Sequence, residues 1–301
     1  MKISVIGASN IDICGRAASG FVPHDSNPGG VTVSLGGVGR NVSHNLRLLG
    51  QDVSFFTAIG GDEHAERIAK DCAMHGVDLS HALYRPDMRS SIYLCVNDAE
   101  GELVAGISDM PLSEAITVEY LERELGHIND ADAVVFDTNL SAEAMEFLMA
   151  RCVPPLFVDC VSRVKAERLK TALENGGSVF TLKANRYEAE VLSGVEVNGG
   201  EAALEAAKRM LSLGAERVFL TLGAEGVCCA DAGGAFLLPA LPTKVANAAG
   251  AGDAFIAALV CALGRGADLR LSADYGQKAA KIALESPAAV SENLSLAALE
   301  E

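Results

Sequence analysis

The chain has 301 residues, half of them hydrophobic and about a fifth charged, which is enough to bury one large core. The formal net charge of -16 excludes nucleic-acid binding through a basic surface, because no cationic stripe is available to neutralise phosphates. No apolar run approaches the roughly 18 residues of a membrane-spanning helix, and the amino-terminal apolar run is too short for a signal peptide. We therefore expect a cytosolic protein with no nucleic-acid and no membrane partner.

Short β-branched runs alternate with longer helical patterns along most of the chain, as in βαβ units of a mostly parallel sheet covered on both faces. In chain order, the predicted core strands are Lys2 to Ile6, Asp52 to Ala58, Ala133 to Phe136, Leu156 to Val158, Ser178 to Leu182 and Arg217 to Thr221. Helices fill the gaps, most clearly Val38 to Leu49, Asp62 to His75, Val118 to Ile128, Ala142 to Arg151, Gly200 to Leu213, Gly252 to Leu263 and Leu271 to Leu284. The pattern predicts a single domain over residues 1–301.

Two segments interrupt this alternation. Residues 13–35 are rich in Gly, Pro and Ser, and residues 89–107 have the pattern of a β-hairpin. Because both leave the α/β body near its first strands, they are expected to pair into a small β-sheet lid over the carboxyl edge of the main sheet, where such folds bind ligands.

The eight cysteines show no CxxC spacing and several lie in apolar runs, so reduced thiols are expected rather than a disulfide framework. The six histidines show neither HxH nor HExxH spacing, which lends little support to a zinc site.

A loop of small residues, Gly250-Ala251-Gly252, runs directly into an apolar helix. Without bulky side chains, the backbone N–H groups of this loop can approach an anion closely, and the helix adds the positive end of its dipole. Asp253 in the first turn repels phosphate but is placed to accept a proton from a hydroxyl that attacks phosphate. The alternative is an Asp that only caps the helix.

A second glycine-rich segment, from Gly36 to Asn41, also precedes a helix. A Rossmann dinucleotide site is disfavoured, because its glycines directly follow the first strand and an acidic residue follows about 20 positions on. Here the first strand leads instead into Asn10 and Asp12. Their short polar side chains, with that of Asn41, suit hydrogen bonds to the vicinal hydroxyls of a sugar.

Four motifs in this order over nearly the full chain resemble those of the ribokinase-like (PfkB) carbohydrate kinases. They are Gly36-Gly37-Val38-Gly39-Arg40-Asn41, Asn185-Arg186-Tyr187-Glu188, Thr221-Leu222-Gly223-Ala224-Glu225-Gly226 and Gly250-Ala251-Gly252-Asp253. The resemblance implies a three-layer α/β/α sandwich and transfer of the γ-phosphoryl group of ATP to a hydroxyl, with Mg²⁺ bound to the phosphates.

The resemblance also implies roles for individual residues. Asp253 would be the catalytic base, and the backbone of Gly250, Ala251 and Gly252 would stabilise the transferring phosphoryl group. Glu188 would organise Mg²⁺ together with Asn185, although a solvated helix carboxylate is the alternative for Glu188. The expected ATP-binding residues are Asn185, Thr221, Gly223 and Gly226, and the expected sugar-binding residues are Asn10, Asp12, Gly37 and Asn41. Asn247, Ala248 and Ala249 stand where many members have Asp-Thr, which leaves dependence on a monovalent cation open.

Within the family, the nearest resemblance is to the members that phosphorylate pseudouridine, carried by Arg40, by residues 25–29, 108–110 and 158–162, and by residues 137–141. Polar side chains suit a uracil ring, which offers two carbonyl acceptors and two N–H donors. The expected additional substrate-binding residues are Asp25, Ser26, Asn27, Arg40 and Asn139. Asn27-Pro28-Gly29 is also good turn chemistry, and ribose, another nucleoside or a sugar phosphate stay open as acceptors.

Two other classes of function stay open: a noncatalytic nucleoside-binding relative and, less consistent with the glycine positions, a nucleotide-dependent oxidoreductase. Retention of Asp253, Asn185 and Glu188 together favours an enzyme. A homodimer formed through the lid is expected, because exposed sheet edges tend to pair between subunits.

Overall fold

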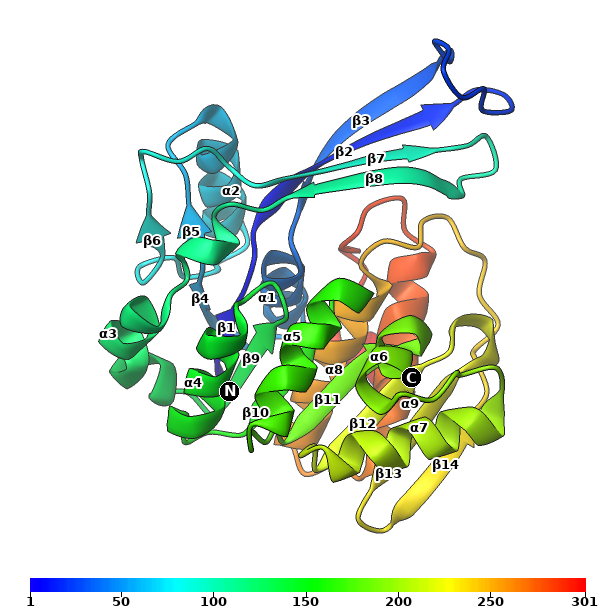
Figure 1. Ribbon diagram of the computed structural model, residues 1–301. Helices are drawn as coiled ribbons and strands as arrows, with labels where there is room; N and C mark the ends of the chain where they lie inside the picture. Colours follow the sequence, from blue (N-terminus) through cyan, green and yellow to red (C-terminus); the bar gives the residue numbers. More distant parts are fainter.

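An eight-stranded sheet forms the centre of the protein, which a computed structural model describes over all 301 residues (Figure 1). Six neighbouring strands are parallel, and an antiparallel hairpin adds two more at one edge. In sheet order, the strands are β14 (Gly234–Leu238), β13 (Val227–Asp231), β12 (Arg217–Thr221), β11 (Thr181–Asn185), β10 (Leu156–Asp159), β9 (Ala133–Asp137), β1 (Lys2–Ile6) and β4 (Asp52–Phe56).

A second sheet of four strands lies above the carboxyl ends of the parallel strands (Figure 1). Its strands, in sheet order, are β3 (Gly29–Gly36), β2 (Asn10–Ala17), β7 (Ile92–Asn97) and β8 (Leu103–Asp109). They come from the two segments that interrupt the α/β alternation, although β2 already begins at Asn10. A separate pair consists of β5 (Ala58–Ile59) and β6 (Leu83–Tyr84).

Helices cover both faces of the main sheet, which gives the expected three layers (Figure 1). The helices are α1 (Val38–Leu48), α2 (Glu63–Met74), α3 (Val118–Asn129), α4 (Ala142–Arg151), α5 (Arg163–Glu174), α6 (Arg186–Ser193), α7 (Gly200–Ser212), α8 (Ala251–Gly264), α9 (Leu269–Leu284) and α10 (Leu296–Glu300), with 3₁₀ turns at Ser113–Ala115 and Gly223–Glu225. None of these helices combines the length and the apolar composition needed to cross a bilayer.

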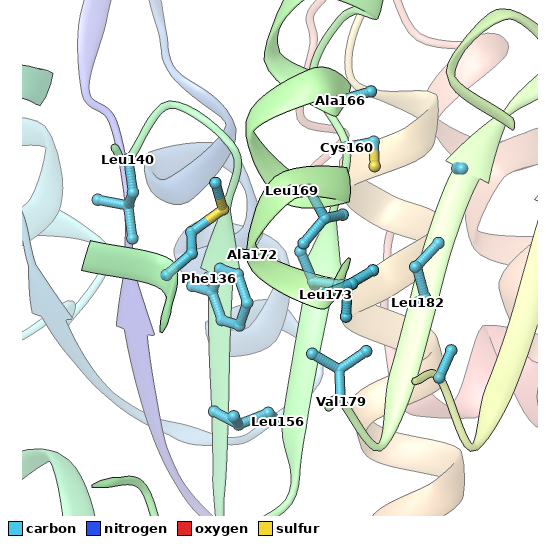
Figure 2. Close-up of a cluster of buried hydrophobic side chains, with 14 of the residues drawn as sticks. Phe136, Leu140, Leu156, Cys160, Ala166, Leu169, Ala172, Leu173, Val179 and Leu182 are labelled. Carbon is cyan, nitrogen blue, oxygen red and sulfur yellow. The ribbon is translucent and has the colours of Figure 1, made fainter. Parts of the chain in front are cut away.

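Two large apolar clusters, one on each face of the sheet, make up most of the core. The helices α3 to α7 supply one cluster, in which Leu169 and Leu173 of α5 lie against Phe136 and Leu182 of the sheet (Figure 2). The helices α1, α2, α8, α9 and α10 supply the other cluster. Since both faces are covered, the central positions of the parallel strands are mostly apolar, and polar residues gather at the strand ends.

Hydrogen-bonding side chains set the start of several helices close to where the sequence predicts them. Asp62, Thr117 and Ser141 each accept a hydrogen bond from the backbone N–H three residues further on. Each therefore satisfies an N–H group that the first turn of the helix leaves without a partner.

Three expectations about strands need correction. The strand predicted at Ser178 to Leu182 lies at Thr181–Asn185, because Lys183 is neutralised by a neighbouring strand and so tolerates a buried position. The strand predicted at Asp52 to Ala58 ends at Phe56, and Ala58–Ile59 pairs with β6 instead. The antiparallel hairpin of β13 and β14 was not predicted.

The expectation of reduced thiols is wrong for one pair of cysteines. Cys14 of β2 and Cys95 of β7 are joined by a disulfide. These two strands pair in parallel with Cys14 opposite Cys95, and their Cα atoms are 4.8 Å apart, within the range that a disulfide spans. A sequence separation of 81 residues hides this proximity. The other six cysteines are free, as expected.

Candidate active site

The glycine-rich loop before α8 forms the expected concentration of N–H groups. Gly250 is the N-cap residue of α8 and has a φ of 81°, and a Cβ at this position would lie 1.8 Å from the carbonyl oxygen of Ala289. Only glycine fits both constraints. The backbone N–H groups of Ala251, Gly252 and Asp253 donate no hydrogen bond within the protein, so they remain available to an anion.

Asp253 is the third residue of α8 and not its N-cap, so the capping alternative does not describe it. Its side chain is 92 % buried, and its Oδ2 accepts a hydrogen bond of 2.6 Å from Asn41 Nδ2. Burial raises the pKa of Asp253 to about 6, although the Asn41 hydrogen bond and the charge of Lys183 oppose this shift. A carboxyl group with such a pKa is deprotonated at neutral pH and basic enough to accept a proton.

Asn41 is held in place by Arg40, its neighbour on α1. Arg40 donates to the side-chain oxygen of Asn41, to the carbonyl oxygens of Leu35 and Gly36, and to Asp71 Oδ2 at 2.9 Å. The guanidinium group is buried and its donors face these protein acceptors. Arg40, expected to contact substrate, thus positions the polar group that contacts Asp253.

Asn10 and Asp12 lie together at the start of the second sheet. Asn10 Nδ2 donates to Asp12 Oδ1 at 2.6 Å, and burial raises the pKa of Asp12. Gly36 of β3 faces this pair, because a Cβ there would lie 2.4 Å from the Asp12 carboxylate. Gly37 has a φ of 97° and turns the chain into α1. The carboxylate and amide therefore lie opposite the end of β3, which leads through Gly37 into the helix that carries Asn41.

Lys183 and Asp159 form a buried ion pair that the site prediction missed. Lys183 Nζ lies 2.6 Å from Asp159 Oδ1, and both side chains are almost entirely buried. A Cβ added at Gly252 would lie 2.5 Å from Lys183 Nζ, so the ammonium group lies against the anion-binding loop. Burial lowers the pKa of Lys183, but the carboxylates of Asp159 and Glu188 outweigh this effect and raise it. The lysine is therefore a fixed positive charge beside the loop.

One signal in the sequence pointed to this pair: charged residues inside otherwise apolar strand patterns at 156–159 and 181–185. A charge in a doubly covered strand needs a partner, and the carboxyl end of a parallel strand is where functional groups collect. The prediction missed it because the two halves of the pair are 24 residues apart.

Asn185 and Glu188 form a capping box at the start of α6. Asn185 Oδ1 accepts from the Glu188 N–H at 3.1 Å, and Glu188 Oε2 accepts from the Asn185 N–H at 2.7 Å. Glu188 is 99 % buried, which contradicts the alternative of a solvated helix carboxylate, and burial raises its pKa. One carboxylate oxygen of Glu188 and the Oδ2 of Asp159 are not used in hydrogen bonds to the protein.

The expected nucleotide loop follows β12. Thr221 Oγ1 donates a long hydrogen bond of 3.4 Å to the Ala184 carbonyl, which joins the ends of β12 and β11. Gly223 and Gly226 have φ values of 62° and 105°, and a Cβ at Gly226 would lie 2.0 Å from the Leu238 carbonyl oxygen. This loop therefore lies at the carboxyl edge, beside Asn185 on the neighbouring strand.

Asp137, at the end of β9, was not predicted as a site residue but connects three segments of the site. Its carboxylate accepts backbone hydrogen bonds from Ala8, Gly39 and Asn139 at 2.8 to 3.0 Å. It thereby joins the segment after β1, the start of α1 and the segment after β9. Glycine at position 7 is required here, because a Cβ would lie 2.2 Å from the carboxylate.

Asn139 faces a cavity of about 380 Å³ beneath the second sheet. Lys165 Nζ donates to Asn139 Oδ1, and the end of β8 contributes Ser108 and Asp109. Two larger cavities, of about 500 and 530 Å³, contain none of the predicted site residues. A smaller cavity, of about 140 Å³, is lined by Asn27 at the outer end of the second sheet.

The structure does not bring Asp25, Ser26 and Asn27 to this group. They lie in the turn at the outer end of β2 and β3, which projects from the body of the protein (Figure 1). The side chain of Asn27 is occupied by the backbone N–H and carbonyl of Val22, at 2.8 and 2.9 Å. In this structure the segment forms a turn, which is the alternative that its sequence also allows.

Comparison with known proteins identifies the family. The sequence model of the pfkB family carbohydrate kinases matches residues 1–295. The chain belongs to the pfkB family of carbohydrate kinases. It is 34 % identical over 297 residues to the pseudouridine kinase of Escherichia coli, covering 98 % of this chain and 94 % of that enzyme.

Two solved kinase structures have the same fold. A carbohydrate kinase from Agrobacterium tumefaciens matches with a TM-score of 0.83 at 29 % identity, covering 99 % of this chain and 95 % of the other. The ribokinase of Thermotoga maritima matches with a TM-score of 0.83 at 22 % identity, covering 99 % and 97 %. The expected ribokinase-like fold and family membership are both confirmed.

Proposed function

We propose that this pfkB-family protein transfers the γ-phosphoryl group of ATP to the 5′-hydroxyl of pseudouridine. The observation that carries the proposal is Asp253, a buried carboxylate with a pKa near 6, in the same helix turn as three backbone N–H groups without partners. The pseudouridine activity named for the Escherichia coli relative supports the choice of acceptor.

In the proposed reaction, Asp253 accepts the proton of the acceptor hydroxyl while the oxygen attacks the γ-phosphorus and ADP departs. The N–H groups of Ala251 and Gly252 and the ammonium group of Lys183 stabilise the negative charge on the transferring group. Because these donors are already fixed, they need no reorganisation as charge develops. Asn41 holds the carboxylate in position through its 2.6 Å hydrogen bond.

The donor set beside the loop fits Mg²⁺. The unused oxygens of Asp159 and Glu188 and the amide of Asn185 are hard oxygen ligands of the kind that this ion prefers. Bound Mg²⁺ would neutralise part of the negative charge of the phosphates. Thr221, Gly223 and Gly226 are proposed to shape the adjoining nucleotide pocket.

Asn10, Asp12 and Asn41 are proposed to hold the ribose, and the cavity at Asn139 to hold the base. In pseudouridine the base is attached through carbon, so both ring N–H groups are free to donate. The cavity offers matching acceptors and donors in Asp109, Asn139 and Lys165. Such a site discriminates strongly against analogues that leave its polar groups unpaired.

A panel of acceptors tests the proposal: pseudouridine, uridine, adenosine, ribose and fructose 6-phosphate, each with ATP and Mg²⁺. We expect the highest kcat/KM with pseudouridine. A higher value with another acceptor would correct the substrate while leaving a kinase. Absence of ATP turnover with all of them would favour the noncatalytic alternative.

We also propose that the second sheet is a lid and that two copies associate through it. Its outer strands expose apolar side chains, with Val31, Leu103 and Ile107 each at least 60 % exposed. Exposed apolar patches of this kind mark interaction sites. Light scattering of the wild-type protein should give the mass of a dimer, and Ile107→Asp should shift it towards the monomer. A monomeric wild-type protein would contradict the proposal.

A further inference from the structure

Outside the candidate active site, two histidines and two carboxylates converge from three segments of the chain. His44 lies on α1, Asp71 and His75 lie at the end of α2, and Glu292 lies in the segment that precedes α10. One ligand atom from each of His44, Asp71 and His75 lies within 4.8 Å of the others. This group, the His44 cluster, is not used by the proposed phosphoryl transfer.

His44 is the least expected member of the cluster. Its side chain is 93 % buried, and neither ring nitrogen has a hydrogen-bond partner. A buried polar atom without a partner destabilises the folded state, so native proteins seldom leave one without a reason. Its Nε2 lies 3.3 Å from Glu292 Oε1, without hydrogen-bond geometry.

His75 is oriented by the backbone of its own helix. Its Nδ1 lies 2.9 Å from the carbonyl oxygen of Asp71, and since a carbonyl oxygen only accepts, Nδ1 carries the hydrogen. The lone pair of the neutral ring is then on Nε2, which lies 3.6 Å from Glu292 Oε1. A histidine whose other nitrogen donates to a backbone carbonyl is the usual arrangement of a metal ligand.

The distances from Glu292 Oε1 to the two imidazole rings are those expected between neighbouring ligands of one ion. Bonds of about 2.0–2.1 Å to zinc in a tetrahedron place neighbouring ligand atoms about 3.3 Å apart. The Nε2 atoms of His44 and His75 lie 3.3 and 3.6 Å from Glu292 Oε1. Asp71 Oδ1 lies 3.6 Å from Nδ1 of His75, the nitrogen opposite the proposed ligand atom, while Asp71 Oδ2 is already bonded to Arg40.

We propose that His44, His75 and Glu292 bind a divalent cation of the zinc class, with Asp71 orienting His75. Two imidazoles and one carboxylate select a borderline cation such as Zn²⁺ over Mg²⁺, which prefers oxygen ligands. The ion would join α1, α2 and the carboxyl-terminal segment whose Ala289 packs on Gly250. Bound there, it would fix two elements that support Asp253.

A second histidine cluster provides a matched control. His81, Glu124 and His127 also lie within 4.8 Å of one another, but His81 Nδ1 is already 3.1 Å from Glu124 Oε2 and forms a hydrogen bond to it. In contrast to His44, no side-chain atom of this cluster is buried without a hydrogen-bond partner.

The experiment titrates Zn²⁺ into the full chain, stripped with a chelator, by isothermal calorimetry. The variants are His75→Gln, Glu292→Gln and, as control, His127→Gln; the first two alter side chains that are 19 % and 68 % exposed, so they should fold. We expect one site in the wild-type and control proteins, at least tenfold weaker in the other two. Circular dichroism checks the fold of each variant, and Mg²⁺ serves as the second probe.

No saturable Zn²⁺ binding to the wild-type protein would overturn the proposal. Wild-type affinity for Zn²⁺ in both His75→Gln and Glu292→Gln would also overturn it. The same holds for a loss of binding in His127→Gln alone, or for displacement of Zn²⁺ by equimolar Mg²⁺. The result is independent of kinase activity, since no acceptor or ATP is present.

Discussion

The surroundings of Asp253 and the second sheet differ in how completely their polar groups are engaged. Asp253, Asn41 and Arg40 are more than 90 % buried and are joined by a continuous series of hydrogen bonds that ends at Asp71. In contrast, β3 and β8 are exposed along almost their whole length, and the turn with Ser26 bonds only to itself. One region is held in place by its own buried hydrogen bonds, while the other exposes most of its side chains to solvent.

This difference is consistent with the proposal that the first region carries out phosphoryl transfer and the second helps to select the acceptor. Phosphoryl transfer depends on groups held rigidly at the developing charge. Selection of an acceptor requires a surface that closes over it and excludes water, which is the usual role of a lid. Substitutions around Asp253 are therefore expected to change chemistry or stability, and substitutions in the second sheet to change specificity.

The largest effect is expected for Asp253→Asn. The amide keeps the size of the side chain but cannot accept the proton of the acceptor hydroxyl, so turnover should fall by roughly 10² to 10⁴. Steady-state kinetics measure kcat, and calorimetry should show ATP binding retained. Asp274→Asn, on the neighbouring helix α9, is the matched control and should leave kcat unchanged. Near-normal turnover of Asp253→Asn would refute the role of this residue.

Next in size is the buried pair of Lys183 and Asp159. Lys183→Met leaves the Asp159 carboxylate buried without its partner, which should lower the free energy of unfolding by about 3–5 kcal/mol. The double variant Lys183→Met with Asp159→Asn removes both charges and should recover part of this loss. Urea unfolding gives the values, with the exposed Lys208→Met as control. If Lys183→Met alone costs no more than Lys208→Met, the pair does not stabilise the fold.

The pH dependence of turnover comes third. The proposed base Asp253 must be deprotonated to accept a proton. Because burial raises its pKa to about 6, kcat should fall about tenfold between neutral pH and pH 5. The sign for stability is opposite. A carboxyl whose pKa is raised on folding stabilises the folded state below its ordinary value of 3.8, and this contribution is lost as the pH rises through about 6.

The pH profile of kcat tests this assignment, because an acid limb near pH 4 would assign the base to an exposed carboxylate. Unfolding curves at several pH values for wild type and Asp253→Asn check the stability term separately.

The smallest effect is expected for the residues proposed to contact the base. It distinguishes Asn139, in the cavity, from Ser26 and Asn27, in the hairpin of the second sheet. Asn139→Ala opens the polar cavity and should lower kcat/KM for pseudouridine about tenfold relative to ribose, about the value of one hydrogen bond in a buried site. The double variant Ser26→Ala with Asn27→Ala should lower kcat/KM for pseudouridine relative to ribose only if the hairpin closes over the nucleoside. Equal changes for both acceptors in both variants would mean that neither set reads the base.

The sequence alone determined the fold class, the family and the central feature of the site. Alternating β-branched runs and helical patterns depend on local burial, so they predicted most core elements to within a few residues. The loop before α8 was predictable because Gly250 must adopt a positive φ and the residues after it must leave their N–H groups open, both of which are local requirements.

Contacts between distant segments were decided only by the tertiary structure. Lys183 is tolerated in a buried strand because Asp159 on the adjacent strand neutralises it, and Cys14 meets Cys95 because β2 and β7 pair in one register. Likewise, His44 and His75 meet only where α1 packs beside the end of α2, so no spacing rule finds them. The physical reason is common to all three: a side chain's electrostatic and bonding partners are set by how elements pack, which a one-dimensional pattern does not specify.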